Sequence, residues 1–192
     1  MNDDHDHFLR SHSSALATFD ALVHAIGDDQ WDASTPDTEW DVSALVDHLV
    51  VEQLWVPPLL AGETVADVGD RFDRTLAGPQ LVGAWEDAAK ESAAAFAADG
   101  ALERQVHLSY GDSAALSYGW EMTADLIVHA WDLAQGIGAP LEIDETIAQE
   151  VWERLSPMAE MLAASGMFGP PVPVPDDAPV FHRLLGLSGR QP

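Results

Sequence analysis

The chain has 192 residues, of which 33 are acidic and 8 basic, so its formal net charge is −25 at pH 7. Such a charge repels the phosphates of nucleic acid and the anionic surface of a membrane, and we expect neither as a partner. The length and a hydrophobic content of 47% predict a single globular domain over residues 1–192.

Cysteine is absent from the sequence. Disulfides, thiolate metal ligands and a cysteine nucleophile are therefore excluded, and any thiol chemistry requires a thiol from outside. The acidic start Met1–His5 does not have the pattern of a signal peptide. The longest nearly apolar run, Ala44–Leu60, is interrupted by charged and polar residues and is not typical of a membrane span. We expect a cytoplasmic protein.

Apolar residues recur at helical spacing in four long segments of the chain. In chain order these segments are about 6–27, about 42–60, about 79–98, and from Ala114 or Ser117 to Gly136. Thr38 or Asp41 is placed to cap the second helix, and Pro79 stands at a favourable first-turn position of the third. The pattern predicts an all-α fold, an antiparallel four-helix bundle with its core at about 5–138.

The connecting segments carry weaker signals. The polar stretch from Gly62 to Gly78 predicts a loop with one short turn around Val68–Phe72. Polar and apolar residues alternate over Arg104–Tyr110, which predicts a short extended segment.

The C-terminal part, about 144–192, is expected to pack against the bundle. Asp144 is placed to cap a fifth helix that runs to about Ser165 with a break at Pro157. The proline-rich stretch Gly169–Pro175 then predicts an extended strap. A last short helix is expected to begin at Asp176 or Asp177 and to run through Leu185.

Asp125 and His129 form the most informative pair of residues. Their four-residue spacing puts a carboxylate and an imidazole on one face of the fourth helix. His48 lies on the second helix and can supply a third ligand from across the bundle. Two histidines and a carboxylate from two packed helices describe an open metal site, which leaves a position for water or substrate.

The two helices differ in how strongly they support this site. On the second helix, His48 and Glu52 fall within an otherwise apolar sector, where buried polar groups need partners. On the fourth helix, one arc contains Glu121, Asp125, His129, Asp132 and Gln135. That arc alone is equally compatible with a solvated helix face. Together, the two polar stripes can satisfy each other through a metal ion in the bundle core.

The other histidines favour simpler interpretations. His5, His7 and His12 are expected in a solvated helix start, and His107 is a weaker candidate that could face the bundle. His24 and His182 show no acidic or histidine partner at ligand spacing and are expected at surface or satisfied core positions.

The tryptophans are expected to pack in the core and at caps. They include Trp40, Trp55, Trp120 and Trp131. Trp55 and Trp131 are also candidates to line a pocket.

Three stretches resemble the DinB-like metal-binding proteins related to the N-terminal domain of mycothiol-dependent maleylpyruvate isomerase. The first contains Trp31, Thr35-Pro36-Asp37-Thr38-Glu39-Trp40-Asp41-Val42 and Leu45-Val46-Asp47-His48-Leu49. The second is Val128-His129-Ala130-Trp131-Asp132-Leu133-Ala134, and the third is Gly169-Pro170-Pro171-Val172-Pro173-Val174-Pro175-Asp176. The resemblance spans nearly the whole chain.

The resemblance implies a four-helix bundle with a divalent metal, usually zinc, although nickel, iron or manganese are alternatives. The matching ligand positions are His48, Asp125 and His129. The isomerase has glutamate where this chain has the shorter Asp125, which leaves Glu52 or Glu121 as substitute ligands or outer partners. The C-terminal tail is too short to be equivalent to the separate C-terminal domain of the isomerase.

These features favour a metal-dependent thiol S-transferase or isomerase-like enzyme. It would activate a low-molecular-weight thiol of the mycothiol type for attack on an electrophilic substrate. The alternatives are a non-catalytic metal- or ligand-binding module, a metal-activated hydrolase, and a bundle without metal whose polar core is hydrogen-bonded. The broad apolar faces of the helices also make a second copy of the chain a candidate partner.

Overall fold

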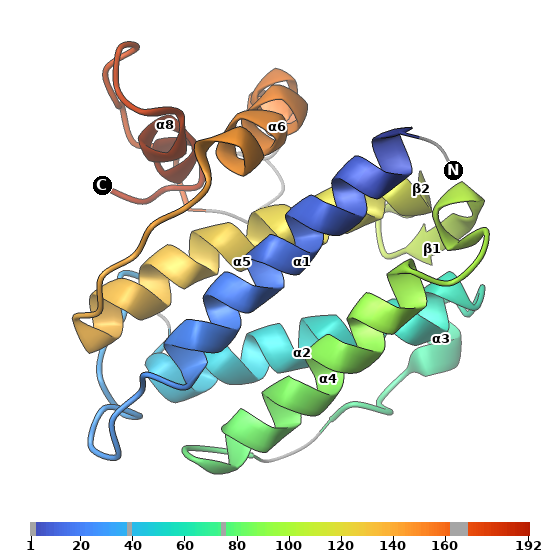
Figure 1. Cartoon of the computed structure of the whole chain (residues 1–192), viewed down its shortest axis with the longest axis horizontal. Helices are drawn as coiled ribbons and strands as arrows, with labels where there is room; N and C mark the ends of the chain where they lie inside the picture. The colour runs from blue at the N-terminus through green and yellow to red at the C-terminus, as the bar shows by residue number, and fades with distance from the viewer. Residues whose placement is uncertain (1–2, 38–39, 74–75, 162–168) are drawn as a thin grey trace.

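The computed structural model describes residues 3–37, 40–73, 76–161 and 169–192. It confirms the predicted all-α four-helix bundle (Figure 1). The four long helices are α1 (Asp3–Val23), α2 (Val42–Leu60), α4 (Gln80–Phe96) and α5 (Ala115–Ile137). Their apolar faces meet in one core that contains fully buried aromatic and aliphatic side chains, among them Phe8, Phe19, Leu49, Trp85 and Leu126.

The helices pack as two pairs. α1 packs along α5 and α2 along α4, and Figure 1 shows that the helices run in the same direction within each pair and in opposite directions between the pairs. The contacts between α1 and α5 agree with this parallel direction, because Phe8 contacts Trp120, and His12 contacts Thr123 further along both helices. α2 and α5 are therefore antiparallel neighbours, which places the predicted metal ligands at one level of the bundle.

Local signals explain the helix ends. The side chain of Asp41 accepts a hydrogen bond from the backbone N–H of Ala44 at 2.8 Å, so Asp41 caps α2 as expected. α1 begins at Asp3, earlier than predicted, and has three aspartates in its first turn, where negative charge is favourable. It ends at Val23 rather than near Gly27. α5 ends before Gly138, whose φ of 68° suits glycine.

The short elements lie at the end of the bundle where α2 and α4 terminate (Figure 1). The predicted extended segment is confirmed as strand β1 (Gln105–Leu108), which pairs antiparallel with β2 (Gly111–Ala114). β2 was not predicted. The turn expected at Val68–Phe72 is instead a short helix, α3 (Val65–Val68), because Thr64 and Asp67 form a reciprocal cap. A 3₁₀ turn, η1 (Ala101–Glu103), precedes β1.

The C-terminal part begins with α6 (Glu145–Leu155), which Asp144 caps as predicted. The expected break at Pro157 is confirmed as a 3₁₀ turn, η2 (Ser156–Met158). The predicted end near Ser165 lies outside the described residues.

The last helix, α8 (Val180–Leu187), packs against α6 (Figure 1). Its predicted start at Asp176 or Asp177 is wrong, because Pro179 disfavours helical backbone at the residue before it. The strap contacts this helix, since the N–H of Val172 donates to the carbonyl of Gly186 at 2.8 Å.

Within the described ranges, no helix combines the length and the apolar character needed to cross a bilayer.

Candidate metal centre

His48 of α2 and the pair Asp125 and His129 of α5 converge between the antiparallel helices. Each offers one ligand atom, and these atoms all lie within 4.8 Å of one another. Nε2 of His48 lies 3.5 Å from Oδ2 of Asp125, and Nε2 of His129 lies 3.3 Å from Oδ1 of the same carboxylate. The structure thus brings the three predicted ligands together, and we call them the metal cluster.

The donor set fits a divalent cation. Oδ2 of Asp125 is buried and has no hydrogen-bond partner of good geometry among the described residues. Burying a carboxylate oxygen without a partner costs free energy, which a bound cation would offset. The side chains of His48 and Asp125 are 26% and 24% exposed, whereas that of His129 is 7% exposed. A carboxylate whose two oxygens each face one imidazole nitrogen matches the ligand preferences of zinc and related metals.

The electrostatics of the metal cluster favour an ionised carboxylate. Burial would raise the pKa of Asp125, but the charge and hydrogen bonding of His129 and His48 outweigh it and hold that pKa well below its ordinary value. Burial likewise lowers the pKa of His129, yet the opposing effects of Asp125 and Asp132 raise it to about 9. Without a metal, His129 and Asp125 therefore form an ion pair.

Glu52 and Glu121 each lie one helical turn from a member of the metal cluster, Glu52 after His48 on α2 and Glu121 before Asp125 on α5. Burial, followed by the charge of Asp125, raises the pKa of Glu52 to about 7, while the two histidines of the cluster oppose this change. Burial also raises the pKa of Glu121, whose carboxylate accepts a hydrogen bond from the hydroxyl of Tyr110. Their assignment as substitute ligands or outer partners stays a prediction.

Trp40 packs against the metal cluster. Its ring centroid lies 4.4 Å from that of His48 and 5.5 Å from that of His129. Sequence reasoning assigned Trp40 only to core and cap packing, because the loop before α2 gave no sign of its distance to α5. The position of Trp40 limits the directions from which a small molecule can approach the two imidazoles.

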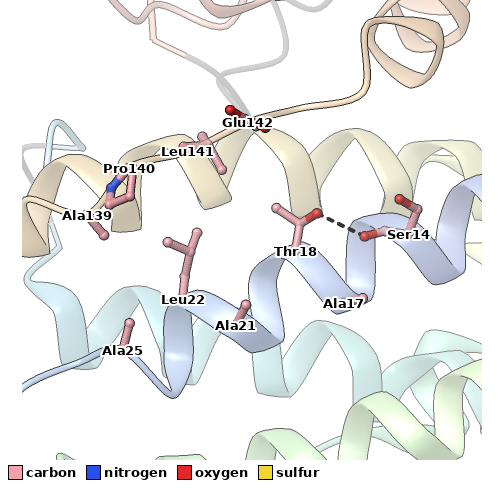
Figure 2. A pocket seen from close by; sticks show the side chains of 10 residues that line it. All are labelled: Ser14, Ala17, Thr18, Ala21, Leu22, Ala25, Ala139, Pro140, Leu141 and Glu142. Carbon is pink, nitrogen blue, oxygen red and sulfur yellow. Dashed lines mark hydrogen bonds between the residues drawn. The ribbon is translucent and has the colours of Figure 1, made fainter.

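A surface groove of about 480 Å³ lies elsewhere, between α1 and the segment that leaves α5 (Figure 2). Its lining includes Ser14, Thr18, Leu22, Leu141 and Glu142, and no residue of the metal cluster. Trp55 and Trp131 do not line it. Trp55 instead meets the ring of Phe72 at 5.9 Å, and the role of both tryptophans beside a substrate stays a prediction.

Two residues next to the metal cluster were not predicted as site residues. Nδ1 of His129 donates to Oδ2 of Asp132 at 2.9 Å, and Nη2 of Arg190 donates to the same oxygen at 2.8 Å. Asp132 was noted on the polar arc of its helix, where its i+3 spacing from His129 was an available signal. Arg190 lies far along the chain and carried no signal in the sequence.

The predicted solvated position of His12 is wrong. The side chain is buried, because this face of α1 packs against α5. Thr123 donates its hydroxyl proton to the carbonyl of Gly119, so Nδ1 of His12 donates to Oγ1 of Thr123 at 3.0 Å. The ring also stacks on Phe8 with centroids 5.4 Å apart. Burial lowers the pKa of His12 to about 4.

The remaining histidines lie outside the metal cluster. His182 is exposed and His5 is half-buried. His7 is also half-buried, with Nε2 3.4 Å from a carboxylate oxygen of Glu150. His107 pairs with Asp112 at 2.7 Å rather than with α2 or α5 residues of the cluster.

His24 is exposed, as its sequence position allowed, but the prediction that it lacks an acidic partner is wrong. Its imidazole lies 2.9 Å from Glu86 and 3.6 Å from Asp20, one helical turn earlier. The spacing to Asp20 was readable from the sequence, whereas the contact to Glu86 depends on the packing of α1 against α4.

Comparison with known proteins extends these observations. Residues 12–134 match the family described as mycothiol maleylpyruvate isomerase N-terminal domain. This range contains all three residues of the metal cluster. The chain is 30% identical over 175 residues to an uncharacterized protein of Mycobacterium tuberculosis strain ATCC 25618 / H37Rv, covering 89% of this chain and 87% of that protein. An uncharacterized protein of strain CDC 1551 / Oshkosh matches with the same identity and coverage.

A solved structure shares the fold. It is the crystal structure of a histidine-to-alanine mutant of the mycothiol-dependent maleylpyruvate isomerase. The two structures align with a TM-score of 0.64 at 16% sequence identity, over 85% of this chain and 72% of the other.

Proposed function

Because this chain belongs to the mycothiol maleylpyruvate isomerase N-terminal domain family, we propose that it binds a divalent metal and activates a low-molecular-weight thiol. The reaction would be that of a thiol S-transferase or an isomerase-like enzyme. The observation that carries the proposal is the convergence of two imidazole nitrogens on an ionised, poorly partnered carboxylate within one bundle. We also propose that residues 1–192 form a single domain and that the thiol is of the mycothiol type.

His48, Asp125 and His129 would hold the metal. Zinc is the expected ion, with nickel, iron or manganese as alternatives, because nitrogen and carboxylate ligands suit all four. When bound, the metal supplies the positive charge that lowers the pKa of a thiol toward neutrality.

The neighbouring residues suggest how the chain would handle the thiol. Glu52 lies beside the metal cluster, half-buried, and is the proposed acceptor of the thiol proton. Trp40 covers both imidazoles and would exclude water from one side. Because the chain has no cysteine, it offers no thiol of its own to an electrophilic substrate.

A non-catalytic metal-binding module is the second candidate. The observation in its favour is that the fold shared with the isomerase structure comes with only 16% sequence identity. A shared fold does not carry an activity with it, so a site that holds a metal can serve binding alone.

The first test is metal content, measured by mass spectrometry on protein purified without a histidine tag. We expect about one metal ion per wild-type chain, loss of the ion in His48→Ala, and retention in His24→Ala, which alters a surface histidine outside the metal cluster. Equal metal content in wild type and His48→Ala would contradict the proposed site.

The second test is activity. Zinc-loaded protein is incubated with mycothiol or glutathione and an electrophile. Thiol consumption is followed with 1-chloro-2,4-dinitrobenzene, and conversion of the cis to the trans double bond is followed with a maleyl compound, because isomerisation regenerates the thiol. Turnover that is present in wild type and absent in His48→Ala supports the enzyme. A stoichiometric metal without turnover across the panel supports the module.

A further inference from the structure

A buried arginine ties the C-terminus of the chain to the interior of the bundle. Arg190 is 8% exposed, although it lies near the end of the chain. Its Nη2 donates to Asp132 at 2.8 Å and to Asp37 at 3.0 Å, and its Nη1 donates to the carbonyl of Ser188 at 2.7 Å. The two carboxylates compensate the positive charge of this buried guanidinium, and the three acceptors together accept hydrogen bonds from its N–H donors.

Of the two carboxylates that Arg190 contacts, that of Asp132 belongs to α5 and is completely buried. Both oxygens of Asp132 lie 3.3 Å from Nε of Arg190, and Oδ2 also accepts the proton of Nδ1 of His129 at 2.9 Å. Asp132 thus stands between the guanidinium and the imidazole. With Nδ1 engaged in this way, Nε2 of His129 is the nitrogen that faces Asp125.

Such an arrangement matters for a metal ligand. An outer carboxylate that accepts the second ring proton of a histidine selects the tautomer and the ring orientation, and loss of such partners commonly weakens metal binding about 10- to 100-fold. The position of Asp132 depends in turn on Arg190. Without the guanidinium, this buried carboxylate would keep the hydrogen bond from His129 but lose the positive charge that compensates its burial.

We propose that Arg190 is a positioning residue for the metal cluster: it fixes Asp132 and thereby the orientation of His129. Docking of the C-terminal segment 169–192 and metal binding at His48, Asp125 and His129 then depend on each other. The metal part of this inference rests on the proposed function above. The orientation part concerns His129 itself and holds in metal-free protein.

The same guanidinium also joins the loop before α2 to the C-terminal segment through Asp37. The N–H of Trp40 donates to the carbonyl of Asp37 at 3.0 Å, and the ring of Trp40 packs on His48 and His129. This guanidinium therefore contacts two neighbours of the metal cluster: Asp132, which holds His129, and Asp37, which precedes Trp40 in the loop. By reciprocity, a metal that fixes His129 strengthens the docking of the C-terminal segment.

The first experiment measures zinc affinity by competition with a chromophoric chelator. We expect binding to weaken about 10- to 100-fold in Arg190→Leu. Arg190→Lys should lie between this variant and wild type, because lysine keeps the charge but not the planar fork. The matched control is Arg183→Leu on α8, which removes an arginine stacked at 4.8 Å over Trp152 without touching Asp132. Equal affinity in wild type and Arg190→Leu would overturn the proposal.

The second experiment uses metal-free protein, so that failure of the positioning role can be distinguished from failure of the proposed metal-binding function. In ¹H–¹⁵N spectra of imidazole-labelled wild type, we expect a slowly exchanging, low-field Nδ1–H signal from His129, assigned with His129→Gln. The signal should broaden or shift in Arg190→Lys and Asp132→Asn and persist in Arg183→Leu. An unchanged signal in Arg190→Lys refutes the positioning role of Arg190, whatever the effect of Asp132→Asn, and it does so even if wild type binds no zinc.

Folding is monitored for every variant by circular dichroism. If Arg190→Leu does not fold, Arg190→Lys and Asp132→Asn decide both experiments.

Discussion

The rings of His48 and His129 meet edge to face, with centroids 5.3 Å apart and an interplanar angle of 73°. They belong to α2 and α5, which run in opposite directions and pack side by side. This crossing brings a histidine from the first part of the chain to the helical turn that carries Asp125. The chemistry that we propose depends on this contact between two helices.

Asp125 is the decisive test of the metal cluster. Asp125→Ala and Asp125→Asn remove the negative charge between the histidines. We expect metal affinity to fall by about 100-fold or more, because losing a residue that only orients a ligand already weakens metal binding about 10- to 100-fold. Asp125→Glu restores the carboxylate with one more methylene and should retain metal. Metal analysis and chelator competition measure both effects. Full metal content in Asp125→Ala would transfer the ligand role to Glu52 or Glu121.

The buried His12 predicts a pH-dependent loss of stability. Its pKa of about 4 in the folded chain lies below the ordinary 6.5, so the unfolded chain binds the proton first as the pH falls. The stabilisation is present above pH 6.5 and is lost progressively toward pH 4, by about 3 kcal/mol in total.

Urea unfolding of wild type and His12→Leu at pH 7 and pH 4.5 measures this difference. The leucine variant lacks the titrating ring, so its stability should fall less over the same interval. Parallel losses in both proteins would show that other groups, such as carboxylates, cause the acid sensitivity.

Gly119 marks a close approach between α5 and α1. A Cβ at this position would lie 2.3 Å from the ring of Phe8, which is itself fully buried. We expect Gly119→Ala to lower the free energy of unfolding by about 1–3 kcal/mol, because overpacking outweighs the better helix propensity of alanine. A Cβ at Gly83 on α4 would meet no neighbouring segment within 4 Å among the described residues. Gly83→Ala should therefore be neutral or stabilising by up to about 1 kcal/mol. Thermal unfolding compares the two variants. Similar effects of both substitutions would contradict the close contact between Gly119 and Phe8.

Asp41 caps the helix that carries His48. Its side chain satisfies the N–H of Ala44, so Asp41→Ala should cost about 1 kcal/mol while Asp41→Asn keeps most of the stability. Asp28→Ala removes an equal charge from an exposed loop position and should have little effect. Chemical denaturation compares the three variants. An equal cost for Asp28→Ala would assign the effect to net charge rather than to the cap.

Much of the fold could be predicted from local signals. A helix is stabilised by contacts within a few residues, so apolar periodicity, Asp41, Asp144 and Pro157 were sufficient to place most helices and their interruptions. Their four-residue spacing likewise placed Asp125 and His129 on one helix face. His48 has apolar neighbours on its own helix, which indicated that its imidazole lies inside the bundle and requires a partner.

The tertiary structure alone decided which polar side chains meet. Periodicity cannot tell whether a polar residue on a helix faces water or a neighbouring helix, so His12 was assigned to solvent although α5 covers it. Arg190 reaches Asp132, which lies 58 residues earlier in the sequence, and no spacing rule relates the two residues. The amino-acid sequence determined the helices and the face that carries Asp125 and His129. The packing direction of the helices and the docking of the C-terminus determined their partners, because those contacts depend on long-range geometry.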